Sequence, residues 1–298
     1  MGKKVALALS SGGARGLVHI GVIDELLSRN YEIVSIAGSS MGALVGGMYA
    51  AGTLGNYEKW AVQLNRMDVL GLVDFTLGTN GFIKGEKIFE EMQRKGFIPD
   101  KSIEELNIPL TVLATDIINN NEVVFQSGKL ADALRASVSI PSVFTPIKTK
   151  NGLLVDGGVL NPLPLSHLKT DGVDLVIAVD TNAIMPYKKP KLAEPIHKES
   201  DEDKSAFEQL KEKWFEFFEG DEKKKLDKHD KLGYIDMLYR VIQVMMSDMT
   251  MRAVEANPPD VFIQTSKDAC GIFEFYRAKE IIDYGRQTCS KALDKANL

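Results

Sequence analysis

Runs of apolar residues alternate with helical periodicity along the first half of the chain. Residues 4–9 form a short β-type run, and residues 15–29 then show helical spacing. A second buried run at 33–37 leads into a second helix at 42–51. One face of the first helix collects Leu17, Ile20, Ile23 and Leu27. This order of strand, glycine-rich turn, helix and strand predicts a parallel α/β sheet.

The rest of the chain adds further strands and two more helices. Continuous apolar runs such as DLVIAVD are typical of strands that are covered on both faces. The polar segment 119–122 has the composition of a hairpin turn, which makes the predicted sheet mixed. Helices are predicted at 233–256 and 274–293, and the methionines of the first are typical of adaptable core packing. The further strands are predicted at 110–114, 123–126, 153–155, 175–179 and 260–264.

A highly charged segment interrupts this pattern at about 186–231. It contains 12 Lys and 13 Asp or Glu, so most of it lies outside a core. Apolar residues recur within it at steps of three and four, which predicts a charged helix with an aromatic stripe. The stripe either docks on its own domain or forms a lid or lipid-contacting helix. Its residues are Phe207, Leu210, Trp214 and Phe217 or Phe218. We predict one domain over residues 1–298 with this charged helical insertion.

Composition and charge restrict the class of protein. With 44% apolar and 26% charged residues over 298 positions, the chain resembles a soluble globular protein with ample material for a core. A formal net charge of -5 disfavours a nucleic-acid binder, which needs a basic stripe. The two cysteines, Cys270 and Cys289, form no disulfide or metal-ligating pattern, so we expect a reducing, cytoplasmic compartment.

Two segments were candidates for targeting or membrane insertion. The apolar run near the N-terminus is too short for a signal peptide, and Ala6 stands where a myristoylation signal needs Ser or Thr. Residues 33–57 carry no charge and are long enough to span a bilayer, but they contain six glycines. We interpret this stretch as a buried strand, a sharp turn and a buried helix.

The strongest chemical signal is the run Gly38-Ser39-Ser40-Met41-Gly42, which fits G-x-S-x-G between a buried strand and a helix. A serine on such a turn has a strained backbone, and glycines two residues on either side leave room for it. Ser40 Oγ then stands near the positive end of the following helix. A small-residue turn in a packed α/β unit is the purely structural alternative.

A second signal is the sequence SSGGARG at residues 10–16, between the first strand and the first helix. Such a loop directs backbone N–H groups toward a phosphate or toward an oxyanion that develops on a carbonyl. A dinucleotide site needs G-x-G-x-x-G and an acidic residue at the end of the second strand. Here the spacing is G-G-x-x-G and that strand ends in Ala37-Gly38, so a dinucleotide site is disfavoured.

The third signal is Asp156, which precedes two glycines at the end of an apolar strand. An Asp in this setting is usually a turn residue. It becomes a candidate base if the parallel order brings this strand end beside Ser40, because functional groups collect at the carboxyl ends of parallel strands. A carboxylate can accept a serine proton when desolvation raises its pKa.

Together the three motifs resemble the patatin-like phospholipase family, whose pattern is a glycine-rich loop, a G-x-S-x-G motif and a distant D-G-G or D-G-A. Residues 108–116 and 135–146 also resemble family sequences. The resemblance covers about residues 4–182 and resumes more weakly at 232–295, whereas the charged insertion has no obvious counterpart. It implies an α/β three-layer sandwich with a mostly parallel central sheet.

The resemblance also implies a Ser–Asp dyad without a catalytic histidine, with Ser40 as nucleophile and Asp156 as base. Arg15 matches a position that is often basic, where it fixes the loop or contacts a lipid head group. The family's loop often begins with Asp, whereas Ser10 and Ser11 stand here, so its anchoring is expected to differ. The oxyanion donors implied by the resemblance are Gly12, Gly13 and Ala14, with the amide of Met41 as an addition.

The implied activity is lipid ester hydrolysis of the phospholipase A or lysophospholipase type, without metal or cofactor. The implied partner is a lipid or acyl-ester substrate. We also expect peripheral contact of the protein with a membrane, and no nucleic-acid partner. An acyltransferase or thioesterase on the same dyad is one alternative, and a lipid-sensing regulatory protein with minor hydrolytic activity is another. The sequence leaves open the head group, the acyl chain and the oligomeric state.

Other polar residues are of types that also serve in catalysis, but their positions favour structural roles. Three histidines follow Asp156, which gives the chain order of an α/β-hydrolase triad, but the serine elbow comes too early for that fold. We expect His197 and His229 to lie at the surface and His167 to have a structural role. His19 is expected to be a packing residue. Asp116 and Asp180 are interpreted as turn or helix-capping groups. Three further serines lack an elbow and are not candidate nucleophiles: Ser137, Ser139 and Ser142.

Overall fold

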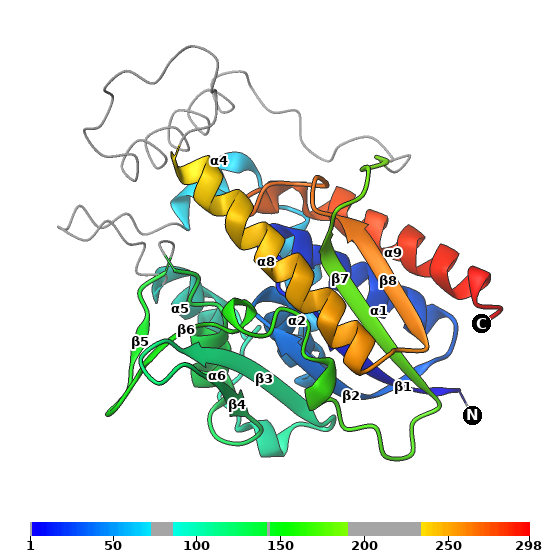
Figure 1. Ribbon diagram of the computed structural model, residues 1–298, viewed down its shortest axis with the longest axis horizontal. Helices are drawn as coiled ribbons and strands as arrows, with labels where there is room; N and C mark the ends of the chain where they lie inside the picture. The colour runs from blue at the N-terminus through cyan, green and yellow to red at the C-terminus, as the bar shows by residue number, and fades with distance from the viewer. Residues whose placement is uncertain (1, 73–85, 142–143, 190–233) are drawn as a thin grey trace, which may run out of the picture.

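The computed structural model describes residues 2–72, 86–141, 144–189 and 234–298 (Figure 1). Nearly all of the predicted charged insertion, including its aromatic stripe, lies outside these residues. The hypotheses about that stripe therefore stay predictions.

The described chain is built around a mixed β-sheet with strand order β5-β6-β3-β2-β1-β7-β8, to which β4 adds on β3. The pairs that join β3, β2, β1, β7 and β8 are parallel, whereas β4, β5 and β6 are joined by antiparallel pairs. The predicted mostly parallel, mixed sheet is thus confirmed. The strands are β1 (Lys4–Leu9), β2 (Glu32–Ser39), β3 (Leu110–Asp116), β4 (Asn121–Phe125), β5 (Ile147–Lys148), β6 (Leu153–Asp156), β7 (Leu175–Ala183) and β8 (Val261–Ser266).

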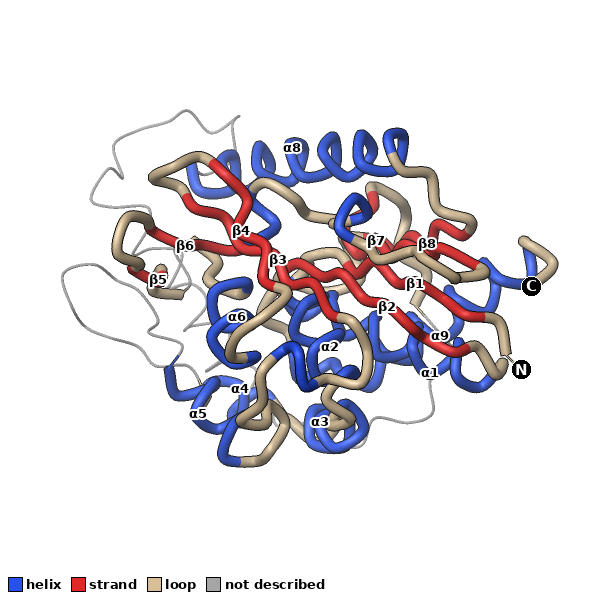
Figure 2. The backbone as a smooth tube through the Cα atoms, turned by 90° about the horizontal axis from the view of Figure 1, so that it is seen from below, coloured by secondary structure: helices blue, strands red, loops and turns tan. Residues whose placement is uncertain are grey.

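Helices cover both faces of the sheet and make the fold three-layered. Seen along the sheet, α8 lies on one face and α1, α2, α6 and α9 lie on the other (Figure 2). The helices are α1 (Val18–Ser28), α2 (Met41–Ala50), α3 (Leu54–Ala61), α4 (Arg66–Gly71), α5 (Glu86–Arg94), α6 (Leu130–Ser137), α8 (Tyr234–Ala256) and α9 (Ala278–Lys295). The expected α/β sandwich is confirmed.

Burial on both faces explains the continuous apolar runs of the central strands. Every residue of β3 is buried, and Val5–Leu9 of β1 are fully inaccessible. On α1 the buried face differs from the prediction by one residue, because Leu26 is buried whereas Leu27 is 43% exposed. The main partner of α1 is α9, which the periodicity of α1 alone does not indicate.

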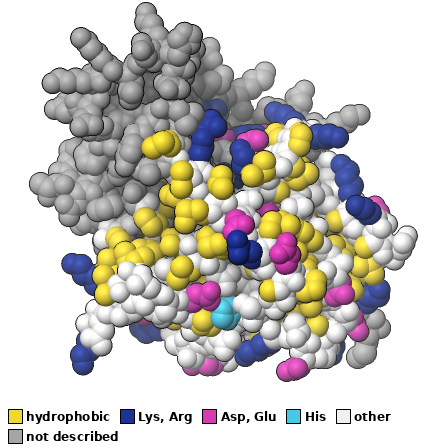
Figure 3. Space-filling view, in the orientation of Figure 1, with side chains coloured by type: hydrophobic (Ala, Val, Ile, Leu, Met, Phe, Trp, Pro, Cys, Tyr) yellow, Lys and Arg dark blue, Asp and Glu magenta, His cyan; other side chains and the backbone are white. Residues whose placement is uncertain are grey.

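Helix α8 does not have the core role that its methionines suggested. Thr250 is its one buried residue among those whose side chains the structure describes, whereas Met237 and Met245 are 45% and 57% exposed. Hydrophobic side chains are visible on the face of the molecule that carries α8 (Figure 3). The periodicity predicted the helix correctly, but the interpretation of these methionines as core was wrong.

The uncharged stretch 33–57 folds into β2, α2 and the start of α3, as predicted. Across the residues that the structure describes, we find no helix that is both long and apolar enough to cross a membrane.

Candidate active site

Ser40 lies on a sharp turn between β2 and α2. Its backbone has φ 55° and ψ -125°, a left-handed conformation that costs free energy in a residue with a side chain. A Cβ at Gly42 would overlap the Leu9 carbonyl, and one at Gly38 would overlap the Ala43 amide, so both motif glycines are required by close backbone approach. The predicted strand–turn–helix elbow is present.

The register of β3 brings Asp156 to this elbow. β2 pairs with residues 110–113 of β3, and β6 pairs with residues 114–116, where Asp156 lies opposite Ala114. Because β4 occupies the other edge of β3 over residues 112–116, β2 and β6 share one edge. β6 runs antiparallel to β3, so the carboxyl ends of β2 and β6 meet head to head. The proximity was predicted, but the parallel order invoked for it was wrong.

Ser40 and Asp156 form a buried hydrogen-bonded pair. Ser40 Oγ donates to Asp156 Oδ2 over 2.5 Å, and Oδ1 accepts the Gly158 N–H at 2.7 Å. Burial raises the pKa of the Asp156 carboxyl to about 7, against the lowering effect of these two hydrogen bonds. At neutral pH this carboxyl is thus poised between the form that accepts a proton and the form that donates one.

Two serines at the end of α6 hold the pair in place. Ser137 Oγ accepts the Ser40 N–H at 2.9 Å, and the Ser139 carbonyl accepts the Asp156 N–H at the same distance. In the sequence these serines differ from Ser40 in lacking an elbow, and nothing else marked them. Helical spacing of apolar residues over 130–137 was a signal that could have placed them at a helix end.

The glycine-rich loop presents fewer amides to Ser40 than the resemblance implied. Gly13 and Met41 line the same pocket as Ser40, and within the described residues no acceptor takes their N–H groups. The Ala14 N–H instead donates to the Ile272 carbonyl at 3.0 Å, so it is not free to donate to an oxyanion. Gly12 is not among the residues that line the pocket. Gly13 and Met41 are therefore the stronger candidates for oxyanion donors.

Residues at the end of β7 anchor this loop. Thr181 Oγ1 and Asn182 Nδ2 both donate to the Ser11 carbonyl, at 2.9 and 2.6 Å, and the Thr181 N–H donates to Ser10 Oγ. A Cβ at Gly12 would overlap Thr181 Oγ1. These contacts anchor a loop that begins with Ser10 and Ser11 rather than with Asp, and no sequence motif marked Thr181 or Asn182.

Arg15 belongs to the same anchoring network. Its guanidinium is buried and donates twice to Asn182 Oδ1, at 2.8 and 3.2 Å, and once to the Lys267 carbonyl at 3.5 Å. It does not line the pocket. Of the two roles suggested for Arg15, these contacts favour fixing the loop, and the role in substrate binding stays a prediction.

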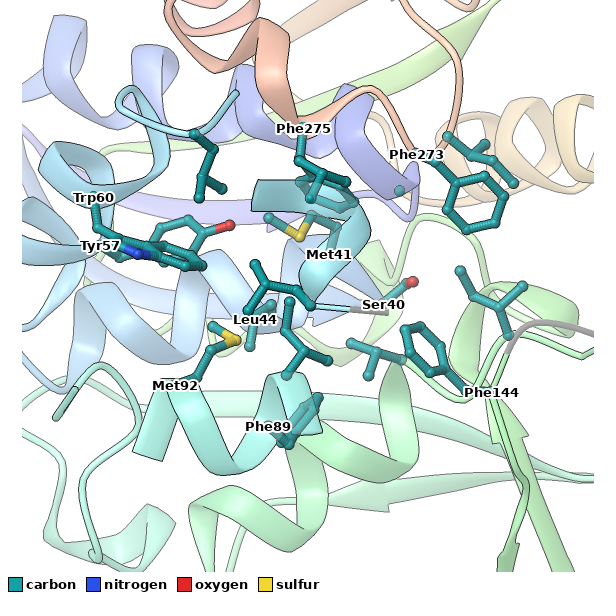
Figure 4. A pocket seen from close by; sticks show the side chains of 18 residues that line it. Ser40, Met41, Leu44, Tyr57, Trp60, Phe89, Met92, Phe144, Phe273 and Phe275 are labelled. Carbon is teal, nitrogen blue, oxygen red and sulfur yellow. The ribbon is translucent and has the colours of Figure 1, made fainter. Parts of the chain in front are cut away.

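An apolar pocket opens beside Ser40 (Figure 4). Its walls come from α2, α3, α4 and α5, from the segment after α6, and from residues 272–275. None of the described residues that line it carries a charge, and the polar side chains among them are Ser40, Tyr57 and Trp60. Such a lining favours the hydrocarbon part of a substrate.

The other polar residues singled out by the sequence have structural contacts where the structure describes them, whereas His197, His229 and Ser142 lie outside the described residues. His19 Nε2 donates to the Ser10 carbonyl at 2.8 Å, and burial lowers the pKa of the imidazole to about 4. His167 pairs with Glu122 Oε2 at 2.7 Å. Asp116 accepts backbone N–H groups in the turn after β3, as expected. Asp180 lies within β7 rather than at a strand end, and burial raises its pKa.

Among the described residues, no group of three or more His, Cys, Asp or Glu side chains could hold a metal ion. Both cysteines are buried free thiols.

Gly13→Ala is expected to lower kcat roughly a hundredfold, because the loss of one aligned oxyanion donor has about that effect. Gly13 has φ +55°, and an added Cβ would lie 2.8 Å from the Ile272 carbonyl, so the loop must shift. Gly52→Ala is the matched control, since φ is +77° there and no atom lies within 4 Å of the added Cβ. Equal kcat values for the two folded variants would contradict the assignment of Gly13.

Comparison with known proteins identifies the class. A family model described as patatin-like phospholipase matches residues 7–169. An uncharacterized NTE family protein of Mycobacterium tuberculosis is 34% identical over 332 positions, which cover 98% of this chain and 91% of that protein. Lysophospholipase nte1 of Emericella nidulans is 31% identical over 188 positions, which cover 61% of this chain and 12% of that protein.

The solved structure of VipD from Legionella pneumophila aligns over 98% of this chain and 67% of its own, with 12% identity and a TM-score of 0.38. Together with the fold, the family match places the protein among the lipid ester hydrolases. The chain belongs to the patatin-like phospholipase family, which confirms the resemblance drawn from its motifs.

Proposed function

We propose that this protein hydrolyses lipid esters through a Ser40–Asp156 dyad, in a reaction of the phospholipase A or lysophospholipase type. The observation that carries the proposal is the 2.5 Å hydrogen bond from Ser40 Oγ to Asp156 Oδ2 beside an apolar pocket. The strained elbow, the buried carboxyl and the two unpaired pocket amides support it.

In the acylation step, Ser40 Oγ forms a bond to the ester carbonyl carbon while its proton passes to Asp156 Oδ2. The Gly13 and Met41 amides donate to the oxygen that becomes negative, and the N-terminal end of α2 adds a favourable field. When the tetrahedral intermediate collapses, the C–O bond to the alcohol breaks. The leaving oxygen takes the proton from Asp156, which restores the carboxylate.

Deacylation repeats these steps with water. Asp156 accepts a water proton as the water oxygen bonds to the acyl carbon, and Ser40 Oγ leaves and takes the proton back. A pKa of about 7 suits a group that must accept and return a proton in each half-reaction.

The apolar pocket indicates which part of the lipid it binds. Because no described lining residue is charged, the pocket accommodates an acyl chain rather than a phosphorylated head group. Relatives such as lysophospholipase nte1 of Emericella nidulans support a lysophospholipid substrate. The head group then lies outside the pocket.

Product analysis tests the proposed reaction. Incubation with lysophosphatidylcholine is expected to release free fatty acid and glycerophosphocholine, with Ser40→Ala prepared in parallel as the control for contaminating lipases. The same incubation with an added alcohol or thiol distinguishes the alternatives. Acyl transfer to the acceptor in preference to water would indicate an acyltransferase, and the absence of turnover on any lipid ester would favour a lipid-sensing role.

A further inference from the structure

Three aromatic rings pack together at the end of the pocket away from Ser40. Tyr57 and Trp60 of α3 line the pocket, and Phe97 packs behind them. The ring centroids lie 5.8 Å apart for Tyr57 and Trp60, 5.7 Å for Tyr57 and Phe97, and 5.4 Å for Trp60 and Phe97. Figure 4 shows Tyr57 and Trp60 at one end of the labelled side chains and Ser40, Phe144 and Phe273 at the other.

The surrounding structure holds this cluster in place. Thr53 Oγ1 donates to the carbonyl of Phe97 at 2.6 Å and is also 3.1 Å from that of Met48, which ties the segment of Phe97 to the start of α3. Tyr57 and Phe97 are only 4% and 5% exposed. Rings packed in this edge-on and tilted manner have few alternative rotamers, so they form a stiff wall.

Trp60 differs from its two neighbours because it also reaches the surface. The residue is partly exposed, and Lys95 Nζ lies 5.9 Å from the centre of its ring. Its indole therefore separates the inside of the pocket from solvent. Removal of the indole would extend the pocket outward rather than leave an enclosed void.

The size of the pocket limits what fits between this wall and Ser40. The cavity has a volume of about 120 Å³. An engineered apolar cavity of about 150 Å³ accommodates one benzene molecule, so this somewhat smaller volume corresponds to an acyl chain of at most about six carbons. A longer chain packs less well between the aromatic rings and Ser40, so we expect its ester to be hydrolysed more slowly.

We propose that Trp60, supported by Tyr57 and Phe97, closes the acyl-chain pocket and makes the enzyme selective for esters of short acyl chains. This inference rests on the proposed function, because it assigns the chain length that the Ser40 site accepts. Trp60 acts by exclusion and takes no part in the chemical steps.

The dependence of kcat/KM on chain length tests the proposal. In a series of p-nitrophenyl esters from butyrate to palmitate in mixed micelles, the wild-type protein is expected to prefer hexanoate to dodecanoate. Trp60→Ala is expected to raise the ratio of kcat/KM for dodecanoate to that for hexanoate by at least about tenfold, since even one methylene in an apolar pocket changes selectivity by that factor. This ratio does not depend on the fraction of folded enzyme.

Phe125→Ala is the control, because Phe125 is a partly buried aromatic residue of β4 that does not line the pocket. It should destabilise the fold without changing the ratio. An unchanged ratio in Trp60→Ala, or an equal rise in Phe125→Ala, would overturn the role of Trp60 while wild-type hydrolysis still supports the proposed function. A wild-type protein that cleaves none of the esters would overturn both.

Discussion

Asp156→Asn and Ser40→Ala are each expected to lower kcat/KM for ester hydrolysis by roughly 10⁴-fold or more, and the double variant to lose no more than either single one. Ser40 Oγ donates to Asp156 Oδ2 over 2.5 Å, and in the proposed mechanism each needs the other for proton transfer. An Asn side chain fills the same space and accepts the Gly158 N–H, but it cannot accept a proton from Ser40. The rates of hydrolysis of a short-chain ester provide the measurement.

Matched controls come from the neighbouring residues. Ser39→Ala removes a hydroxyl that donates to the Asn161 carbonyl, and Asp116→Asn changes a carboxylate in the turn after β3. Both variants are expected to keep most of the activity. A folded Asp156→Asn variant with wild-type turnover would refute the dyad, because another group would then have to accept the serine proton.

The second large effect is that a rise in pH should increase activity and decrease stability, in both cases because Asp156 ionises. Only the ionised carboxylate can act as base, so kcat/KM is expected to rise about tenfold per pH unit below an apparent pKa of about 7 and to level off above it. The residual kcat/KM of Asp156→Asn should not show this fall at low pH.

Stability should change with pH in the opposite direction. The pKa of Asp156 is about 7 in the folded protein and near the ordinary value of 3.8 in the unfolded chain. Its contribution to stability is therefore complete below about pH 4 and is lost as pH rises to about 7, by on the order of 4 kcal/mol. Asp156→Asn escapes this loss, so it is expected to unfold at higher denaturant concentration than the wild-type protein at pH 8.

Asp116→Asn provides a control of opposite sign, because hydrogen bonds from Asn119 and nearby backbone N–H groups lower the pKa of Asp116. Its replacement should bring no gain in stability at pH 8. A wild-type protein whose free energy of unfolding does not fall between pH 4 and 7, relative to Asp156→Asn, would show that Asp156 is not buried as the structure has it.

The sequence predicted the described strands other than the two-residue β5, and the elbow, because these depend on local signals. The assignment of Asp156 as the base came from the family resemblance and stays a prediction. Apolar runs of strand length and small residues at fixed offsets are visible without knowledge of the fold. The elbow follows from Ser40 and the glycines around it. The first helix was placed correctly, and only its buried face was off by one residue.

The other features of the site depend on pairing between distant segments. β6 is antiparallel to β3, yet nothing within 153–156 indicates its direction. Likewise, the Ala14 amide is occupied by Ile272, and the loop is anchored by Asn182, which are neighbours only in the folded chain. The pocket could not be predicted, because its walls come from several segments that share no motif.

The most direct test of the dyad is covalent labelling of the intact protein with a fluorophosphonate, with the site identified by mass spectrometry and the rate followed from pH 5 to 9. We expect a single adduct on Ser40, formed at a rate that rises with pH through about 7 and that falls to background in Asp156→Asn. An adduct on another residue, or full labelling of Ser40 in the folded Asp156→Asn variant, would contradict it.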